Sequence, residues 1–128
     1  MKLVPSLGVE DIERSLAFYR DHFGFEVTTD HAVEGELVWC CLRSEGAELM
    51  LQQLGPDHPT PPDPPSWVLY LSPPDVRELH AQLKAGGVEV SPLEPTSYGT
   101  VECFAKDPDG YELWISAEAT SEGSGQPA

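Results

Sequence analysis

An α+β fold made of two tandem βαβββ modules is predicted by three features of the sequence. Landmark residues return at a constant offset of 64 positions, so that Asp11 corresponds to Asp75 and Leu7 to Leu71. Each half contains apolar residues at helical spacing, and then stretches in which apolar and polar residues alternate as in strands. Each half also ends with an acidic residue, glycine, any residue and then Glu-Leu, at Glu48 and Glu112. A repeat with one offset indicates that the same supersecondary unit was built twice.

The first module is expected to run in the order strand, helix and three strands. Asp11 is a good N-cap, apolar residues at helical spacing follow it, and Gly24 can end the helix. A hairpin turn at 44–46 joins the last two strands. The predicted elements are a strand over 3–9, a helix over 12–23, and strands over 25–28, 36–43 and 48–54.

The second module repeats this order. Pro74 and Asp75 open a helix whose apolar face is Val76, Leu79 and Leu83, and two glycines stop it at 86–87. The Asp-Pro-Asp-Gly sequence at 107–110 is a turn signal, because proline presets φ and glycine tolerates a positive φ. The predicted strands are 67–72, 88–90, 101–106 and 111–116, with a loop over 91–99.

The length of 128 residues predicts one compact domain over 1–118. Its modules, 1–54 and 66–118, are each small for an independent core and are expected to share one. Residues 55–65 hold six of the 13 prolines, which favours a semi-rigid linker; a proline-rich recognition peptide is the alternative. Residues 119–128 are rich in Ser and Gly and are expected to form a disordered tail.

The composition excludes some partners. A net charge of −15 argues against nucleic acid, which needs a basic face. The acidity serves either solubility or the attraction of a cationic ligand. Three cysteines without metal or redox spacing fit a reducing, cytoplasmic setting. No apolar run approaches the length that spans a membrane, and no signal region opens the sequence, so we expect no membrane partner.

The combination of motifs resembles the vicinal oxygen chelate superfamily, which comprises glyoxalases, bleomycin-resistance proteins and extradiol dioxygenases. The resemblance covers residues 3–117. It rests on the duplicated βαβββ unit, on Asp-x-x-x-Ser-x-x-Phe-Tyr from Asp11 to Tyr19, on Phe23-Gly24-Phe25, on the stretch 83–88 and on the turn at 107–110. It implies that each module curls its sheet into a half-open cup and that two cups form a ligand cleft.

The same resemblance implies where a metal would bind. The metal enzymes of that superfamily place His, Gln or Glu on the first and fourth strands of each module. Here those four positions hold Val4, Met50, Val68 and Trp114. None of these side chains suits a hard or borderline divalent ion, so we expect no metal and no other cofactor. Glu48 and Glu112, nearby on the fourth strands, could hold an ion only weakly, with waters retained.

The four histidines do not supply the missing ligands. We expect solvated or structural roles for all of them, at a helix end, in a loop, in the linker and on the second helix respectively: His22, His31, His58 and His80.

Strand alternation separates a face covered by the helix from a face that lines the cup. The apolar residues expected to face the helix are Leu7, Val9, Val38, Cys40, Leu42, Leu49, Leu51, Leu69, Leu71, Val101, Cys103, Ala105, Leu113 and Ile115. The expected ligand-binding residues are Trp39, Cys41, Glu48, Met50, Gln52, Val68, Tyr70, Glu102, Phe104, Glu112 and Trp114, together with Tyr98 from the preceding loop; Ser6 and Arg43 share their face. Aromatic platforms bind flat rings and cations, and carboxylates add charge. The alternative is that Trp39, Phe104 and Trp114 fill the cup as core or bury a dimer contact.

Within the superfamily the pattern is most similar to the bleomycin-resistance branch, whose acidic proteins lack the metal ligands and sequester a cationic, planar-ring antibiotic between two subunits. The local match includes residues 39–42 before a glycine hairpin and then 49–51. We therefore expect a binder of a small aromatic or cationic molecule, in a cleft formed by a homodimer. The alternative is a lyase, isomerase or dioxygenase with a rearranged site. Glu48, Glu102 or Glu112 would then be its acid–base group, with a pKa raised by apolar neighbours.

Overall fold

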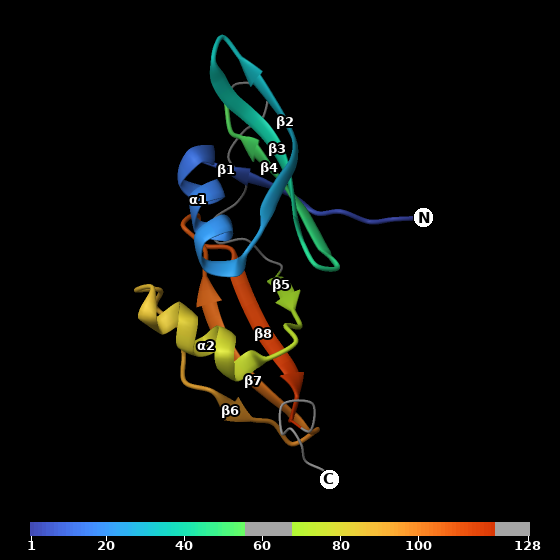
Figure 1. Ribbon diagram of the computed structural model, residues 1–128, viewed down its shortest axis with the longest axis vertical. Coiled ribbons are helices and arrows are strands. Elements are labelled where there is room, and N and C mark those ends of the chain that lie inside the picture. Colours follow the sequence, from blue (N-terminus) through green and yellow to red (C-terminus); the bar gives the residue numbers. More distant parts are fainter. Residues whose placement is uncertain (56–67, 120–128) are drawn as a thin grey trace. The chain divides into compact units, whose positions relative to one another are not determined.

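The computed structural model describes residues 1–55 and 68–119, and the chain divides into two compact units, Met1–Asp63 and Pro64–Ala128 (Figure 1). Each unit carries one of the two predicted βαβββ modules. Most of the proline-rich stretch, at 56–65, and the expected tail, at 120–128, lie outside the described residues. A single domain with a shared core therefore stays a prediction.

Unit 1 contains β1 (Ser6–Val9), α1 (Ile12–Phe23), β2 (Glu26–Val33), β3 (Glu36–Ser44) and β4 (Ala47–Gln53). The sheet order is β1-β4-β3-β2. Strand β1 is parallel to β4, and the other neighbours are antiparallel. The helix crossover from β1 leads the chain to β2 at the opposite edge of the sheet, so β1 and β2 are the two edges and β4 and β3 fill the middle.

The bounds predicted for the first helix are confirmed, because its end signals are local. The Asp11 side chain accepts a hydrogen bond from the backbone N–H of Arg14 at 3.2 Å, and Gly24 ends the helix in the left-handed conformation with φ 73°. The buried stripe of α1 includes Leu16 and Tyr19, and it packs against β3 and β4. The Tyr19 ring also meets Phe25 edge to face at 5.9 Å.

Two strands of unit 1 differ from their predicted bounds by more than one residue. Strand β1 begins at Ser6 rather than at residue 3, and β2 continues to Val33 rather than ending at residue 28. His31 therefore lies in a strand and not in a loop. Register shifts against β3 break the alternation of β2, and its eight residues are all exposed, so the sequence carries no apolar period there.

Unit 2 contains β5 (Val68–Leu71), α2 (Val76–Ala85), β6 (Glu94–Pro95), β7 (Thr100–Lys106) and β8 (Glu112–Glu118). The sheet order is β5-β8-β7-β6, with β5 parallel to β8, which repeats the topology of unit 1. The Asp75 side chain caps α2 by accepting from the N–H of Glu78 at 3.0 Å. The helix packs against β7 and β8.

The strand predicted over 88–90 is wrong. Only Val90 pairs there, in an isolated bridge with Ala105, and the third strand of the module is instead the two-residue β6, inside the expected loop. Proline lacks the N–H that a ladder needs, and Pro92 and Pro95 limit this edge to short pairings. Strand β8 also runs on to Glu118, two residues beyond its predicted end.

Alternation along the strands gives each unit one buried and one open face. Of the residues predicted to face the helix, Leu7, Val9, Cys40, Leu42, Leu49, Leu51, Val101, Cys103, Ala105, Leu113 and Ile115 are buried, whereas Val38, Leu69 and Leu71 are half-buried. The predicted strand register is therefore correct. No helix within residues 1–55 and 68–119 is long and apolar enough to cross a membrane.

Candidate functional site

The open face of unit 1 brings together all of the site residues predicted in that unit. Across β3 and β4, Trp39 lies opposite Gln52, Cys41 opposite Met50, and Arg43 opposite Glu48. The predicted residues Trp39, Cys41, Glu48, Met50 and Gln52 are all half-buried. They lie on the face of the sheet opposite to the buried side chains of β3 and β4.

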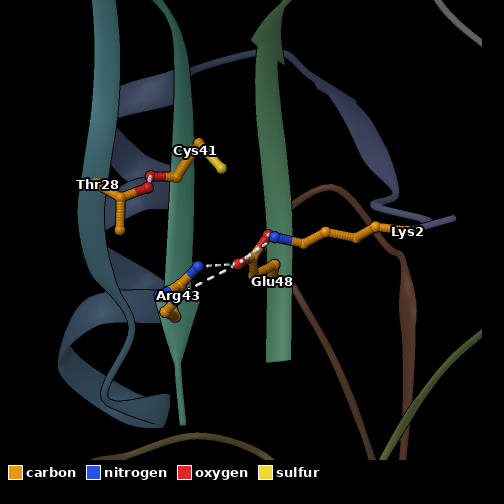
Figure 2. A network of polar contacts seen from close by, with 5 residues as sticks. All are labelled: Lys2, Thr28, Cys41, Arg43 and Glu48. Carbon is orange, nitrogen blue, oxygen red and sulfur yellow. Dashed lines mark hydrogen bonds and ion pairs between the residues drawn. The ribbon is translucent and has the colours of Figure 1, made fainter. Parts of the chain in front are cut away.

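Strand β2 extends this face with two residues that the sequence did not indicate. Thr29 pairs with Cys41, and His31 pairs with Trp39. They were missed because the extra residue Thr28 shifts the register; its hydroxyl donates to the carbonyl of Cys41 at 3.3 Å (Figure 2). No local period signals such a bulge.

Glu48 is the centre of a polar network on this face (Figure 2). Its carboxylate accepts hydrogen bonds from Lys2 Nζ at 2.9 Å and from Arg43 Nε at 2.9 Å, and Arg43 Nη2 contacts it as well. Hydrogen bonds from Lys2 and then from Arg43 lower the pKa of Glu48. The expectation that apolar neighbours raise this pKa is therefore wrong. A carboxylate that two cations hold ionised is a poor proton donor and has little charge left for a ligand.

In unit 2 three aromatic side chains form a row across the open face, which we call the aromatic row. Tyr70 on β5 lies beside Trp114 on β8, and Trp114 lies beside Phe104 on β7. The Phe104 and Trp114 rings meet edge to face, with centroids 5.5 Å apart and an interplanar angle of 84°. Tyr70 is 56% exposed, Phe104 40% and Trp114 39%. The row therefore presents ring surface to solvent within the described chain.

Carboxylates stand on both sides of the aromatic row. On one side Glu112, whose neighbours are Val68 and Lys106, accepts a hydrogen bond from Trp114 Nε1 at 3.1 Å. This bond satisfies the only polar group of the indole and fixes the ring.

On the other side of the row Glu102 accepts from the Tyr98 hydroxyl at 2.8 Å and from Thr100 Oγ1 at 3.4 Å. The Glu102 carboxylate raises the pKa of Tyr98, chiefly through this hydrogen bond, which only the protonated phenol can donate. Tyr98 is 70% exposed, and the contact ties its loop to the open face of unit 2. Lys106 and Ser116 lie on the same face and were not predicted as site residues, although the alternation of β7 and β8 places them there.

The resemblance implies metal ligands at four positions, which hold Val4, Met50, Val68 and Trp114 in this chain. Val4 precedes β1 and Met50 lies in β4, whereas Val68 and Trp114 lie in unit 2. Among residues 1–55 and 68–119 no three His, Cys, Asp or Glu side chains gather as a metal site would require.

The histidines and the buried cysteines have other surroundings. His80 Nε2 lies 2.9 Å from the carbonyl oxygen of Ser91, His22 packs against Phe18, and His58 lies outside the described residues. Burial raises the pKa of the Cys40 and Cys103 thiols to about 11. Both thiols are therefore protonated near neutral pH and are neither ligands nor nucleophiles there.

Comparison with known proteins agrees with the fold described above. A family sequence model described as the Glyoxalase/Bleomycin resistance protein/Dioxygenase superfamily matches residues 4–115. A search of curated proteins gave no match.

Three solved structures illustrate the likeness of fold. A bleomycin resistance determinant encoded on the transposon Tn5 is 23% identical with a TM-score of 0.73, and the alignment covers 93% of this chain and 98% of that chain. A bleomycin-binding protein complexed with bleomycin is 21% identical with a TM-score of 0.72, covering 92% and 98%. A lactoylglutathione lyase from Agrobacterium tumefaciens is 19% identical with a TM-score of 0.66, covering 91% and 92%. Since the family sequence model spans nearly all of the chain and the topology is two βαβββ modules, the chain belongs to the glyoxalase/bleomycin resistance protein/dioxygenase superfamily.

Proposed function

We propose that the protein is a non-enzymatic binder that sequesters a small aromatic or cationic molecule in a cleft formed by a homodimer. The observation that carries this proposal is the aromatic row, Tyr70–Trp114–Phe104, exposed on the open face of unit 2 between the carboxylates of Glu112 and Glu102. Two of the structurally similar proteins are a bleomycin-binding protein and a bleomycin resistance determinant, which supports a binding role.

The chemistry of the row suits a flat, positively charged ligand. An aromatic ring stacked on another contributes about 0.5–1.5 kcal/mol beyond the area that it buries, and a cation over an indole face contributes about as much at an exposed site. Glu112 already satisfies the indole N–H of Trp114, so the face of the ring remains for a ligand. The net charge of −15 would attract a cation over a longer range.

The carboxylate and thiol side chains that could take part in catalysis are poorly suited to acid–base or nucleophilic roles. The pKa of Glu48 is lowered by Lys2 and Arg43, which suits a fixed anion better than a general acid near neutral pH. The thiols of Cys40 and Cys103 are buried and protonated. These observations favour binding over the lyase, isomerase or dioxygenase alternative, in which Glu102 or Glu112 would act.

The surface that each unit leaves open supports the proposed homodimer. Strand β2 is an edge strand whose eight residues are all exposed, and the aromatic row of unit 2 is also exposed. Proteins usually cover such edges and apolar patches with a partner. Sedimentation of the full chain at micromolar concentration is expected to give a dimer, and a stable monomer would contradict this part of the proposal. All three cysteines are free, which suits the cytoplasmic setting that we propose.

A titration with metal-free bleomycin tests the function, because this probe carries planar rings and positive charge. Calorimetry of the full chain is expected to show saturable binding that Trp114→Ala weakens by about tenfold, as the loss of a stacked ring predicts. Incubation with lactoylglutathione, the compound named for one similar enzyme, is expected to leave its concentration unchanged. Turnover of lactoylglutathione without bleomycin binding would favour the enzyme alternative.

A further inference from the structure

Next to the aromatic row lies a polar pair, Ser116 and Glu102, of which the proposed function uses only the carboxylate of Glu102. Ser116 on β8 is directly opposite Glu102 on β7, and both side chains lie on the open face of unit 2. Ser116 is only 2% exposed. Its hydroxyl has no hydrogen-bond partner within residues 1–55 and 68–119. A buried hydroxyl without a partner costs free energy until water or a ligand supplies one.

Glu102 also has acceptor capacity to spare. Its Oε2 atom accepts from Tyr98 and Thr100, whereas Oε1 has no partner in the described part of the chain. A carboxylate oxygen accepts more than one hydrogen bond, and a serine hydroxyl both accepts and donates. Two acceptors and one negative charge thus lie side by side across adjacent strands, which is the pattern that an ammonium group requires.

We infer that Ser116 and Glu102 form a subsite for a primary ammonium group on the ligand whose ring rests on Trp114 and Phe104. This inference builds on the proposed function and narrows its ligand class to aromatic amines with a flexible tether. Trp114 and Ser116 are two residues apart on β8, which places them about 7 Å from one another along the strand. A tether of about three carbon atoms between ring and nitrogen spans such a distance.

Tyr98 is the neighbour that the ligand would displace. Its hydroxyl is bonded to Glu102, and its ring is 70% exposed in the loop between β6 and β7. An ammonium group that takes over as donor to Glu102 brings a positive charge to the carboxylate, which the neutral Tyr98 hydroxyl does not.

A matched pair of probes separates this subsite from the aromatic row. Naphthylpropylamine and naphthylpropanol share the ring and the tether but differ in charge, and their binding to the full chain can be followed from the indole N–H signal of Trp114 by NMR. We expect the amine to bind about tenfold more tightly than the alcohol. Ser116→Ala and Glu102→Gln should each remove most of that preference and leave the affinity for the alcohol within about twofold.

Glu94→Gln is the control, because Glu94 pairs with Glu102 on β6 but lies one strand further from Ser116. This variant should retain the preference for the amine. The subsite would be contradicted if the two probes bound equally or if Ser116→Ala weakened the binding of both probes equally. It would also be contradicted if Glu94→Gln had as large an effect as Glu102→Gln. None of these outcomes would contradict ligand binding at the aromatic row. If neither probe shifts the Trp114 signal, both the subsite and the proposed function are contradicted.

Thermal unfolding gives a second readout that a purely structural hydroxyl would not produce. Because the Ser116 hydroxyl has no partner in the described residues, Ser116→Ala should leave the melting temperature unchanged or raise it. A marked fall would mean that the hydroxyl already has a structural role, and would overturn the inference.

Discussion

The side chain of Gln53 joins the end of strand β4 to the start of helix α1. Its Oε1 atom accepts a hydrogen bond from the backbone N–H of Ile12 at 2.9 Å, and its Nε2 donates to the carbonyl of Glu10 at 2.6 Å. The first N–H groups of a helix have no partner within it, so an acceptor from a distant strand satisfies one of them. One amide thus ties the crossover of unit 1 to its sheet.

Gln53→Ala is therefore expected to destabilise the protein by about 1–3 kcal/mol, because the half-buried N–H of Ile12 and the carbonyl of Glu10 lose their partner together. Urea unfolding of both proteins measures the difference. Gln52→Ala, which removes one bond to the carbonyl of Val38, is the control and should cost clearly less. Equal losses in the two variants would show that the link to α1 has no special weight.

The hairpin between β2 and β3 contains backbone strain that a single substitution could relieve. Glu34 has φ 52° and Gly35 has φ 82° in the two-residue turn that joins Val33 to Glu36. Asparagine followed by glycine suits such a turn, whereas glutamate in a left-handed conformation is strained. Glu34→Asn should raise the free energy of unfolding by up to about 1 kcal/mol. Glu34→Ala, which keeps the strain, should give no such gain; a gain equal to that of Glu34→Asn would point to charge rather than backbone conformation.

Elements with local signals could be predicted from the sequence. The ends of α1 are determined by Asp11 and Gly24, both of which act within a few residues of their position. The alternation of β7 and β8 likewise predicted that Leu113 is buried and Trp114 exposed, because burial of one face enforces the strand register.

Features that depend on distant partners could not be predicted. Strand β2 continues past residue 28 because β3 pairs with it through two register shifts, and no apolar period in β2 reports that pairing. The pKa of Glu48 was wrongly expected to rise because Lys2, 46 positions earlier in the sequence, supplies its first hydrogen bond. The sequence did not single out Ser116 as a site residue, because the burial of its side chain could not be predicted from the sequence.

Neighbouring residues on β8 should separate binding from folding. Trp114→Ala removes an exposed ring from the aromatic row and should weaken ligand binding with little loss of stability. Leu113→Ala removes a fully buried side chain on the opposite face and should cost about 2–5 kcal/mol. Bleomycin titration and urea unfolding of both variants measure the two effects. If Leu113→Ala mainly weakened binding and Trp114→Ala mainly weakened stability, the assignment of the buried and open faces of β8 would be wrong.

The Glu48 network predicts a pH dependence with a definite sign. A carboxyl group whose pKa is lower in the folded protein contributes stability above its unfolded pKa, and this contribution is lost as the pH falls through the folded pKa. The stability difference between the wild type and Glu48→Gln should therefore be fully present at neutral pH. It should shrink only once the pH falls below about 4.5, the ordinary value.

Added salt should reduce the same difference at neutral pH, because the partners of Glu48 are exposed and their attraction is screened. Thermal unfolding across pH in low and high salt measures both effects. A difference that grows on acidification would reverse the sign and exclude the network as its cause.

The last prediction concerns the metal. The resemblance implies metal ligands on the first and fourth strands of each module, and the matching positions here are Val4, just before β1, and Met50, Val68 and Trp114. A hydrated divalent ion would shed water at these positions and gain two hydrocarbons, a thioether and an indole, none of which replaces a carboxylate or an imidazole. The carboxylate of Glu48 is moreover bound by Lys2 and Arg43, which would compete with a metal ion for it. We expect no stoichiometric Zn, Ni, Fe or Mn after dialysis against metal-free buffer, and no loss of bleomycin binding in the presence of a chelator. Elemental analysis that finds about one equivalent of such a metal per chain would move the choice from the binder to the enzyme.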